Sequence, residues 1–412
     1  MPAIIEIPRV VAEVCPYFAD LFANEPQRQH MAEFLTGLIV ARRKSVNGMH
    51  DEFAVTTDQS CWNRFLTEAD WDVQAFNERR LEWLQRDPST RYHDEGVIPI
   101  DNVLIDHDGK LIEDVGWYWD HAEDRYKIAH DYLFANYVCP GGKHYPLDFR
   151  LFKKRDRCDA EGKKFHDHGV LFRELVDWVV GRNIPGDFTF DSYFSSAENL
   201  NHIHSQIDRW GRPRGYVGDL KMNRKIWYRG REIKANELAA SIDPASRKPL
   251  RRGDARQWYF TCTVHIPGVH HKVRILILWN RRRDANPCKI LVTNRITWEV
   301  NRIQGVYRYR WTGTETFHRD GKQELGMGDC QLRDGQGQTR HMYLVMLAYS
   351  VLMCQLKQGR AKEWALRRLM TIGEACRAVL GETLRTTLEW AVQQAVENPE
   401  KARHIPALLG LT

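Results

Sequence analysis

The segment Tyr307–Gln323, with the sequence YRYRWTGTETFHRDGKQ, places one carboxylate among several bases at helical spacing. Counting from Glu315, the residues His318, Arg319 and Lys322 follow at positions i+3, i+4 and i+7, on one face of a helix. We therefore predict a helix whose charged face contacts DNA phosphates beside a metal-binding carboxylate, because cations offset phosphate charge and the acid supplies oxygen ligands. A solvated helix surface is the alternative that this segment alone leaves open.

Two further acids are expected where buried strands end. Asp101 follows the apolar run Val97–Ile100, and Asp191 follows the predicted strand Phe188–Phe190. Because strand ends are rigid and converge on one side of a sheet, Asp101, Asp191 and Glu315 are predicted to form one catalytic metal site. Three carboxylates suit Mg²⁺, with Mn²⁺ as a substitute, and two ions about 4 Å apart would assist phosphoryl transfer. A turn or a helix cap is the alternative role for each aspartate taken alone.

Length and composition indicate a well-packed globular protein. A chain of 412 residues with 43% hydrophobic residues and 14 tryptophans predicts two or three domains. The nine cysteines have no disulfide or zinc-binding spacing, so we expect reduced thiols. The N-terminus lacks the pattern of a secretion signal, and the longest apolar run, Met342–Cys354, is too short to span a bilayer. We expect a buried core helix at this run and no membrane partner.

Basic residues are clustered along the chain, and aromatic residues lie near several clusters. The net charge of +6 does not by itself indicate a nucleic-acid partner. Clustered cations with aromatic side chains, however, can follow a phosphate backbone and stack exposed bases. From these clusters we predict DNA contacts at Arg42, Arg43, Lys44, Lys221, Arg224, Trp258 and Trp279. For the two tryptophans, burial within a strand is the alternative.

The patterning along the chain predicts an α/β protein with a mixed sheet and flanking helical regions. Helical periodicity dominates the first 95 residues, with predicted helices at Gln27–Arg43 and Asp70–Leu84 and a helix start at Thr56–Gln59, whereas strands alternate with helices from Gly96 onward. Further predicted strands are Val115–Trp119, Lys127–Cys139 and Gly215–Leu220, with a turn at His121–Arg125 between the first two. Further predicted helices are one that begins at a capping box at Ser195 and runs to about Arg209, and one at Trp298–Leu325. Trp258–Ile266 and Val273–Trp279 are predicted strands on either side of a Pro-Gly turn. The predicted domains are a helical DNA-binding domain (1–95), the first part of a catalytic core (96–225), a β-rich insertion (226–286), the second part of the core (287–358) and C-terminal helices (359–412).

The order of these motifs resembles that of bacterial insertion-sequence transposases of the DDE class. The segments VIPIDN (Val97–Asn102), FTFDSYFSS (Phe188–Ser196) and YRYRWTGTETFHRDGKQELG (Tyr307–Gly326) look like the three acidic motifs of that family. The most similar group is the cut-and-paste one whose third motif combines tyrosine, arginine, glutamate and lysine. Other segments that resemble the family are QRQHMAEFLTGLIVARRKS, VGWYWDHAEDRYKIAHDY, LKMNRK and RHMYLVMLAYSVL.

This resemblance implies a ribonuclease-H-like core, similar to that of retroviral integrases, with a β-rich insertion before the glutamate helix. It implies a transposase that pairs two transposon ends as a homodimer, cleaves DNA at terminal inverted repeats and joins the 3′ ends to target DNA. The implied location is the bacterial cytoplasm, in association with the nucleoid. A tryptophan of the insertion would stack on a flipped base. The implied contacts to terminal phosphates are made by Tyr307, Arg310 and Lys322.

Two motifs depart from the family pattern. Where relatives often show two adjacent aspartates followed by threonine, this chain has Asp101-Asn102-Val103, and Asp106 is an alternative first ligand. Four residues instead of three separate Arg310 from Glu315. One extra residue turns a helix by about 100°, so either Gly313 absorbs it in a bent helix start or Arg310 has moved.

Two other functional hypotheses stay open from the sequence. The first is a catalytically inactive DNA-binding regulator descended from a transposase. The second is a carboxylate-based hydrolase, for example one acting on polysaccharide, with two acids in acid/base roles and tryptophans along a sugar cleft. The transposase would need a divalent metal ion for activity, whereas the hydrolase would stay active in excess chelator. The regulator would bind DNA without cleaving it.

Overall fold

The computed structural model describes residues 4–120, 123–252, 255–357, 368–398, 400 and 404–409. The chain forms two compact units, each built from separate stretches of sequence. Unit 1 comprises Met1–Arg91, Leu104–Asp131 and Phe317–Thr412, and unit 2 comprises Tyr92–Val103 and Tyr132–Thr316.

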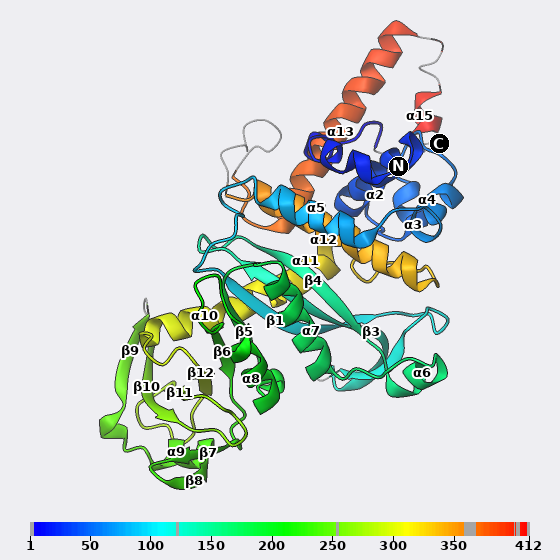
Figure 1. Cartoon of the computed structure of the whole chain (residues 1–412). Helices are drawn as coiled ribbons and strands as arrows, with labels where there is room; N and C mark the ends of the chain where they lie inside the picture. The colour runs from blue at the N-terminus through cyan, green and yellow to red at the C-terminus, as the bar shows by residue number, and fades with distance from the viewer. Residues whose placement is uncertain are drawn as a thin grey trace. The chain divides into compact units, whose positions relative to one another are not determined.

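Unit 1 is mainly helical, and α12 is its central helix. This helix contacts α2, α4, α5 and α13 (Figure 1). Nearly all of its residues are buried. The buried core helix predicted at Met342–Cys354 is thus confirmed. The helices of unit 1 are α1 (Arg9–Ala12), η1 (Cys15–Leu21), α2 (Glu25–Val40), α3 (Val46–His50), α4 (Gln59–Thr67), α5 (Val73–Leu84), α12 (Gly335–Gln355), α13 (Ile372–Glu397) and α15 (Ile405–Leu408).

Side-chain caps fix the starts of the N-terminal helices. Asn24, Asp58 and Asp72 precede α2, α4 and α5, and each side chain accepts a hydrogen bond from a backbone N–H in the first turn. Such caps satisfy donors that a helix start leaves without an intrahelical partner. The helices predicted in the first 95 residues are therefore present, with their ends shifted by a few residues. No helix in the described part of the chain is long and apolar enough to cross a membrane.

Unit 1 also contains the hairpin of β2 (Gly116–Asp120) and the first half of β3 (Arg125–Val138). Both strands were predicted, although part of the predicted turn at 121–125 lies outside the described residues. The side chain of Lys127 is buried in this hairpin, and its Nζ donates to three carboxylates. The acceptors are Asp106 Oδ2 at 2.8 Å, Asp120 Oδ2 at 2.8 Å and Glu123 Oε1 at 2.5 Å.

Unit 2 is built on a mixed sheet with the strand order β3-β1-β5-β6-β12-β11-β10-β9, and β4 also pairs with β3. β1, β5 and β6 are parallel to one another, whereas β6, β12, β11, β10 and β9 pair antiparallel. The mixed α/β architecture predicted from the sequence is confirmed. The strand bounds are β1 (Val97–Asp106), β4 (His144–Phe152), β5 (Asp187–Phe190), β6 (Tyr216–Asp219), β9 (Lys248–Arg252), β10 (Ala255–Val264), β11 (Val273–Trp279) and β12 (Lys289–Thr293).

Helices cover both faces of this sheet. On one face, Phe172 of α7 packs on Phe190 of β5 with ring centroids 5.3 Å apart. On the other face, α10 packs on a cluster that includes Val97 and Val217. Successive side chains of a strand point to opposite faces, so the two helices lie on opposite sides. The smaller elements of unit 2 are α6 (Arg155–Ala160), α7 (His168–Gly181), η2 (Ser192–Phe194), α8 (Ala197–Ser205), β7 (Lys225–Tyr228), β8 (Arg231–Lys234), α9 (Ala235–Ser241), η3 (Pro244–Ser246) and α10 (Val300–Gly313).

Several predicted details are wrong. β1 does not end at Asp101 but continues to Asp106. The cap of α8 is Ser196, whose hydroxyl accepts from Asn199 N, instead of Ser195, and the helix ends at Ser205 instead of near Arg209. The strand β4 was not predicted.

The predicted insertion also takes a different form. Its strands β9, β10 and β11 do not form a sheet of their own but extend the main sheet through β12. β7 and β8 pair with each other as a two-stranded hairpin, which a single bridge between Trp227 and His265 joins to the end of β10 (Figure 1).

Candidate active site

The register of the parallel strands brings acidic residues to one level of the sheet. Val97 pairs with Asp187 and Pro99 with Thr189, so the same offset sets Asp101 beside Asp191. The pairing of Phe190 with Gly218 sets Asp219 beside Asp191 on the next strand. Three aspartates from neighbouring strands therefore lie in one row.

These aspartates also share a face of the sheet. Val97 and Val217 belong to the cluster that packs on α10, and side chains two or four residues further along a strand point the same way. Asp101 and Asp219 stand at these positions, so they point toward α10. Glu315, the first residue of α11 (Glu315–Glu324), directly follows α10 and Thr314.

The predicted single helix Trp298–Leu325 is broken just before Glu315. α10 ends at Gly313, and Thr314 donates from its backbone N and its Oγ1 to Arg310 O at 3.0 and 2.8 Å. A Cβ built at Gly313 would lie 2.4 Å from Pro99 Cγ and 2.7 Å from Val138 Cγ2. Only glycine allows this close approach of α10 to the sheet, and of the two alternatives open from the sequence, the structure has the bent helix start.

Asp101 is the most buried acid of the row, with 7% of its surface exposed. Its Oδ2 accepts from Arg310 Nη1 at 2.5 Å. Burial raises the pKa of Asp101 to about 7, against the lowering effect of Arg310, and the charges of Asp191 and Glu315 raise it further. Asp191 and Glu315 are thus close enough to Asp101 for their charges to repel that of Asp101.

Asp191 joins the row as the residue that caps η2. Its Oδ1 accepts from Tyr193 N at 2.9 Å. Burial raises the pKa of Asp191, and the charge of Asp219 contributes in the same direction. Asp191 therefore has the cap role considered from the sequence and also lies beside the other carboxylates.

Asp219 and Lys289 are site residues that the sequence did not single out. Lys289 Nζ donates to Asp219 Oδ2 at 3.0 Å and to the hydroxyl of Tyr307 at 3.2 Å. Tyr307 in turn lies beside Arg310, whose guanidinium carbon is 5.8 Å from the ring centroid. A signal for Asp219 was its place as an acid next to the last residue of the predicted strand Gly215–Leu220.

Comparison with known families agrees with this arrangement. The profile of the DDE superfamily endonucleases matches residues 17–235. The chain belongs to the DDE superfamily endonucleases. The match includes Asp101 and Asp191 and ends before Glu315. No curated protein matches the sequence.

Enzymes of this superfamily use divalent metal ions, and the donor set of this chain fits such an ion. Asp101, Asp191 and Glu315 supply only oxygen donors, and the repulsion of Asp101 by the other two is a cost that a cation relieves. Among the described residues, no three acids or other ligands are already arranged to hold a metal. Arg310 is the present counter-ion of Asp101, so an ion bound through Oδ2 of Asp101 would compete with this guanidinium.

The alternative first ligand Asp106 belongs elsewhere. It stands five residues after Asp101 on the same strand, an odd spacing that points its side chain to the opposite face. Its Oδ2 is bound by Lys127 Nζ. The geometry therefore favours Asp101.

The basic residues of the predicted charged helix face differ in exposure. His318 is buried, with 6% of its surface exposed, which does not fit the predicted contact with DNA. The guanidinium of Arg319 is exposed and pairs with Asp320 at 2.8 Å. Lys322 is exposed and donates from Nζ to Leu104 O at 2.7 Å.

The predicted basic cluster at the end of α2 splits in the same way. Arg42 and Arg43 are exposed and line a cleft of about 820 Å³ within unit 1, together with Lys110 and Arg333. Lys44 is buried, and its Nζ donates to Leu38 O at 2.6 Å near the end of α2. Burial lowers the pKa of Lys44 to about 8. A DNA contact by Lys44 does not fit this position, because its ammonium group is used inside the fold.

In unit 2, the two predicted tryptophans face each other across the β10–β11 ladder. Trp279 is fully buried and cannot stack on a base without unfolding its surroundings. Trp258 is half-buried between the guanidinium groups of Arg256 and Arg282, 4.7 and 5.0 Å from its ring centroid. The remaining predicted cations are Lys221, which is exposed, and Arg224, which is half-buried.

Proposed function

We propose that this DDE endonuclease is a transposase that binds transposon ends, cleaves DNA with divalent metal ions and joins the 3′ ends to target DNA. The observation that carries the proposal is the acidic row of Asp101 and Asp191 with the charge of Glu315 acting on Asp101. Metal-dependent cleavage of phosphodiesters needs such a set of oxygen ligands on rigid elements. The order of the three acidic motifs supports the transposase class within the family.

In this proposal, Asp101, Asp191 and Glu315 hold two Mg²⁺ ions. When bound, the ions lower the pKa of the attacking water or 3′-hydroxyl and stabilise the leaving oxygen. Asp219 and Lys289 flank the row as an ion pair, and Lys289 holds the hydroxyl of Tyr307. Arg310 neutralises Asp101 before the metal binds and is then free to pair with a DNA phosphate.

The proposed partner is double-stranded DNA with terminal inverted repeats, together with target DNA. The exposed Arg42 and Arg43 are suited to its phosphates, because guanidinium groups bind phosphate oxygens with two donors at once. Half-buried Trp258, flanked by two guanidinium groups, is the remaining candidate for stacking on a base. We propose a homodimer in the complex with paired ends, as in similar transposases.

A nicking assay on DNA that carries the element's own ends tests the catalytic assignment. Glu315→Gln should remove Mg²⁺- or Mn²⁺-dependent cleavage while leaving DNA binding intact. Glu299→Gln is the matched control, because Glu299 is exposed, precedes α10 and makes no side-chain cap. Cleavage by Glu315→Gln at the rate of the parent would refute the catalytic role of Glu315.

The same assay separates the alternatives. DNA binding by the parent without cleavage in any divalent metal would identify a regulator. Hydrolysis of polysaccharide that persists in excess chelator would identify the carboxylate-based hydrolase. Joining of pre-cleaved 3′ ends to a plasmid distinguishes a transposase from a nuclease that only cuts.

A further inference from the structure

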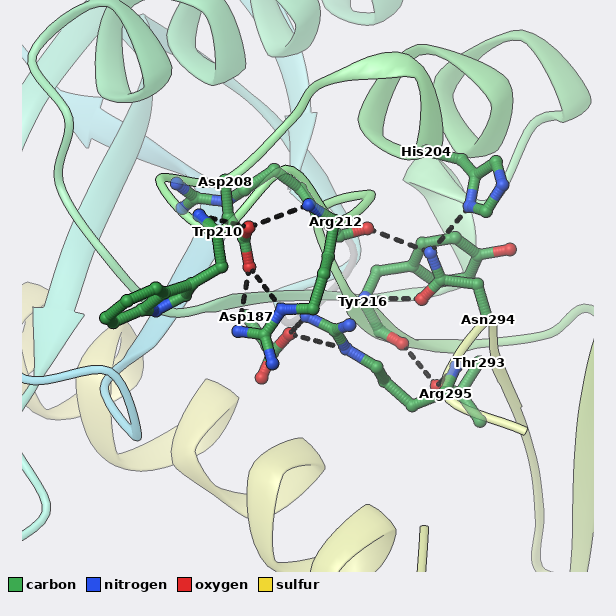
Figure 2. Close-up of polar contacts among 10 residues, drawn as sticks. Asp187, His204, Asp208, Trp210, Arg212, Tyr216, Thr293, Asn294 and Arg295 are labelled. Carbon is green, nitrogen blue, oxygen red and sulfur yellow. Dashed lines mark hydrogen bonds and ion pairs between the residues drawn. The ribbon is translucent and has the colours of Figure 1, made fainter. Parts of the chain in front are cut away.

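A second polar site lies at the end of the strands away from the acidic row. Asp187 begins β5, whereas Asp191 follows its last residue. With a rise of about 3.3 Å per residue, the two ends are roughly 13 Å apart. The loop between α8 and β6 closes over this end through a bridge between Ile207 and Pro213, and Figure 2 shows the polar residues gathered there. A hollow of about 50 Å³ lies among them.

The side chain of Asp208 holds the loop in shape. Its Oδ1 accepts from the backbone N–H groups of Trp210 and Arg212 at 2.8 and 2.9 Å, and its Oδ2 accepts from the Arg212 guanidinium (Figure 2). Gly211, with a φ of 73°, allows the tight turn. The loop is thus a fixed frame that presents Trp210 with 60% of its surface exposed.

Three arginines in this site form ion pairs with three aspartates, and a fourth arginine forms none of these pairs. Arg209 pairs with Asp94 at 2.5 Å, Arg212 with Asp208 at 3.0 Å and Arg295 with Asp187 at 2.7 Å. The remaining arginine is Arg214, which lines the same hollow. Four cations therefore face three anions.

Arg214 is buried, with 4% of its surface exposed, so bulk water does not solvate it. In the described part of the chain, its Nε and Nη2 have no hydrogen-bond partner. A guanidinium group keeps its proton even when buried, and N–H groups left without acceptors in such a place are strongly unfavourable. An anion with two or more oxygens in the hollow would satisfy them, because the guanidinium fork matches such an anion.

The surrounding backbone leaves room for the charged groups. A Cβ at Gly215 would lie 1.9 Å from Asp187 Oδ1 and 2.1 Å from Arg295 Nε. Only a glycine next to Arg214 allows the Asp187–Arg295 pair to lie this close to the chain. The ion pair and the unsatisfied guanidinium are therefore held side by side by the backbone.

We propose that this hollow binds the phosphate group of a nucleotide, with Arg214 as its main ligand and the base stacked on Trp210. Trp210 favours a nucleotide over a simple anion, because an exposed indole beside a guanidinium group stacks bases, and Arg209 lies 5.0 Å from its ring centroid. The nucleotide is either free or part of a nucleic-acid strand. The proposal does not depend on DNA cleavage by the acidic row.

Thermal shift and calorimetry on the full chain test this proposal, with the Glu315→Gln background to exclude cleavage. Inorganic phosphate should raise the Tm relative to chloride at equal ionic strength, and by more than acetate, which has only two oxygens and a smaller charge to pair with Arg214. Deoxyadenosine monophosphate should bind about 5- to 150-fold more tightly than phosphate, as expected for one stacked base.

Two variants assign the residues. Trp210→Ala, at an exposed position that leaves the core intact, should abolish the advantage of the nucleotide over phosphate. Arg214→Met should abolish the effect of phosphate. An oligothymidylate whose affinity falls in both variants identifies a strand as the source of the phosphate, whereas binding of the mononucleotide alone identifies a free nucleotide.

Three results would overturn the proposal. The first is that phosphate does not raise the Tm of the parent, which would mean that water satisfies the Arg214 N–H groups. The second is that acetate raises the Tm as much as phosphate does. The third is that Arg214→Met binds phosphate as tightly as the parent.

Discussion

Replacing Gly313 by alanine tests the close packing of α10 on the strand that carries Asp101. The new Cβ would lie 2.4 Å from Pro99 Cγ and 2.7 Å from Val138 Cγ2, closer than Cβ atoms approach their neighbours in real structures. Neither neighbour can rotate away easily, because one is a proline ring and both lie on strands. Overpacking of this kind costs about 1–3 kcal/mol, whereas glycine to alanine in a helix gains about 1 kcal/mol at most. We expect Gly313→Ala to lower the free energy of unfolding by about 1–2 kcal/mol.

Gly305→Ala is the matched control, since Gly305 lies in the same helix and a Cβ there would meet no atom within 4 Å. This variant should gain about 0.5–1 kcal/mol from helix propensity alone. Urea unfolding, with the dependence of the free energy on urea concentration unchanged between variants, gives the free energy of unfolding of each variant. Hydrogen exchange of the α10 amides shows whether the change lies in this helix. Equal stabilisation by the two substitutions would refute the packing described for Gly313. Because Gly313 is two residues from Glu315, metal-dependent cleavage should also fall, by up to about 100-fold.

Three further predictions concern single charged or titratable side chains. Arg310→Met should make Mn²⁺ raise the Tm more than in the parent, because it removes the counter-ion that occupies Asp101; an unchanged metal effect would contradict this role. Burial lowers the pKa of His341 to about 4 in the folded chain, so on acidification the unfolded chain takes up this proton first. The free energy of unfolding should therefore fall by on the order of 3 kcal/mol as the pH drops from about 6.5 to 4. His341→Gln should reduce that slope in thermal unfolding at stepped pH, although His107 and His271, whose pKa values burial also lowers to about 4, still contribute. An unaltered slope would exclude His341 as a source. Lys44→Met should lower the free energy of unfolding by about 1–3 kcal/mol with little direct effect on DNA binding, whereas Arg42→Met should weaken DNA binding without loss of stability. Urea unfolding and filter binding measure the two quantities. Weaker DNA binding by a stable Lys44→Met, with unchanged binding by Arg42→Met, would contradict both assignments.

Strands and helices with strong periodicity were predictable from the sequence. The strand-like runs on either side of the Pro-Gly turn identified β10 and β11, and the length and polarity of Met342–Cys354 identified a core helix. The strand β4 was missed because its burial is nearly continuous and its sequence, HYPLDFRLF, mixes charge and proline with the apolar residues. The merging of the insertion into the main sheet depends on pairing between β12 and its two neighbours, which no local pattern encodes.

The candidate site was predictable in its carboxylates but not in their counter-ions. Asp101 and Asp191 stand after apolar runs, and that pattern is local. The pairing of Arg310 with Asp101 depends on how α10 crosses the sheet, and the ion pair of Asp219 with Lys289 joins strands that are distant in sequence. Burial of Lys44 was also invisible, because a run of three cations looks the same whether or not one of them turns inward.

The parallel register that aligns Asp101 with Asp191 determines where the chain tolerates changes in length. A single-residue insertion between Val97 and Ile100 would turn Asp101 to the opposite face of the sheet, although the composition of the strand would hardly change. Insertions in the connections between β1, β5 and β6 leave the alignment untouched. Length variation among homologous sequences should therefore be confined to these connections, and a sequence with an odd insertion inside β1 should have lost the acidic site even if all of its aspartates remain.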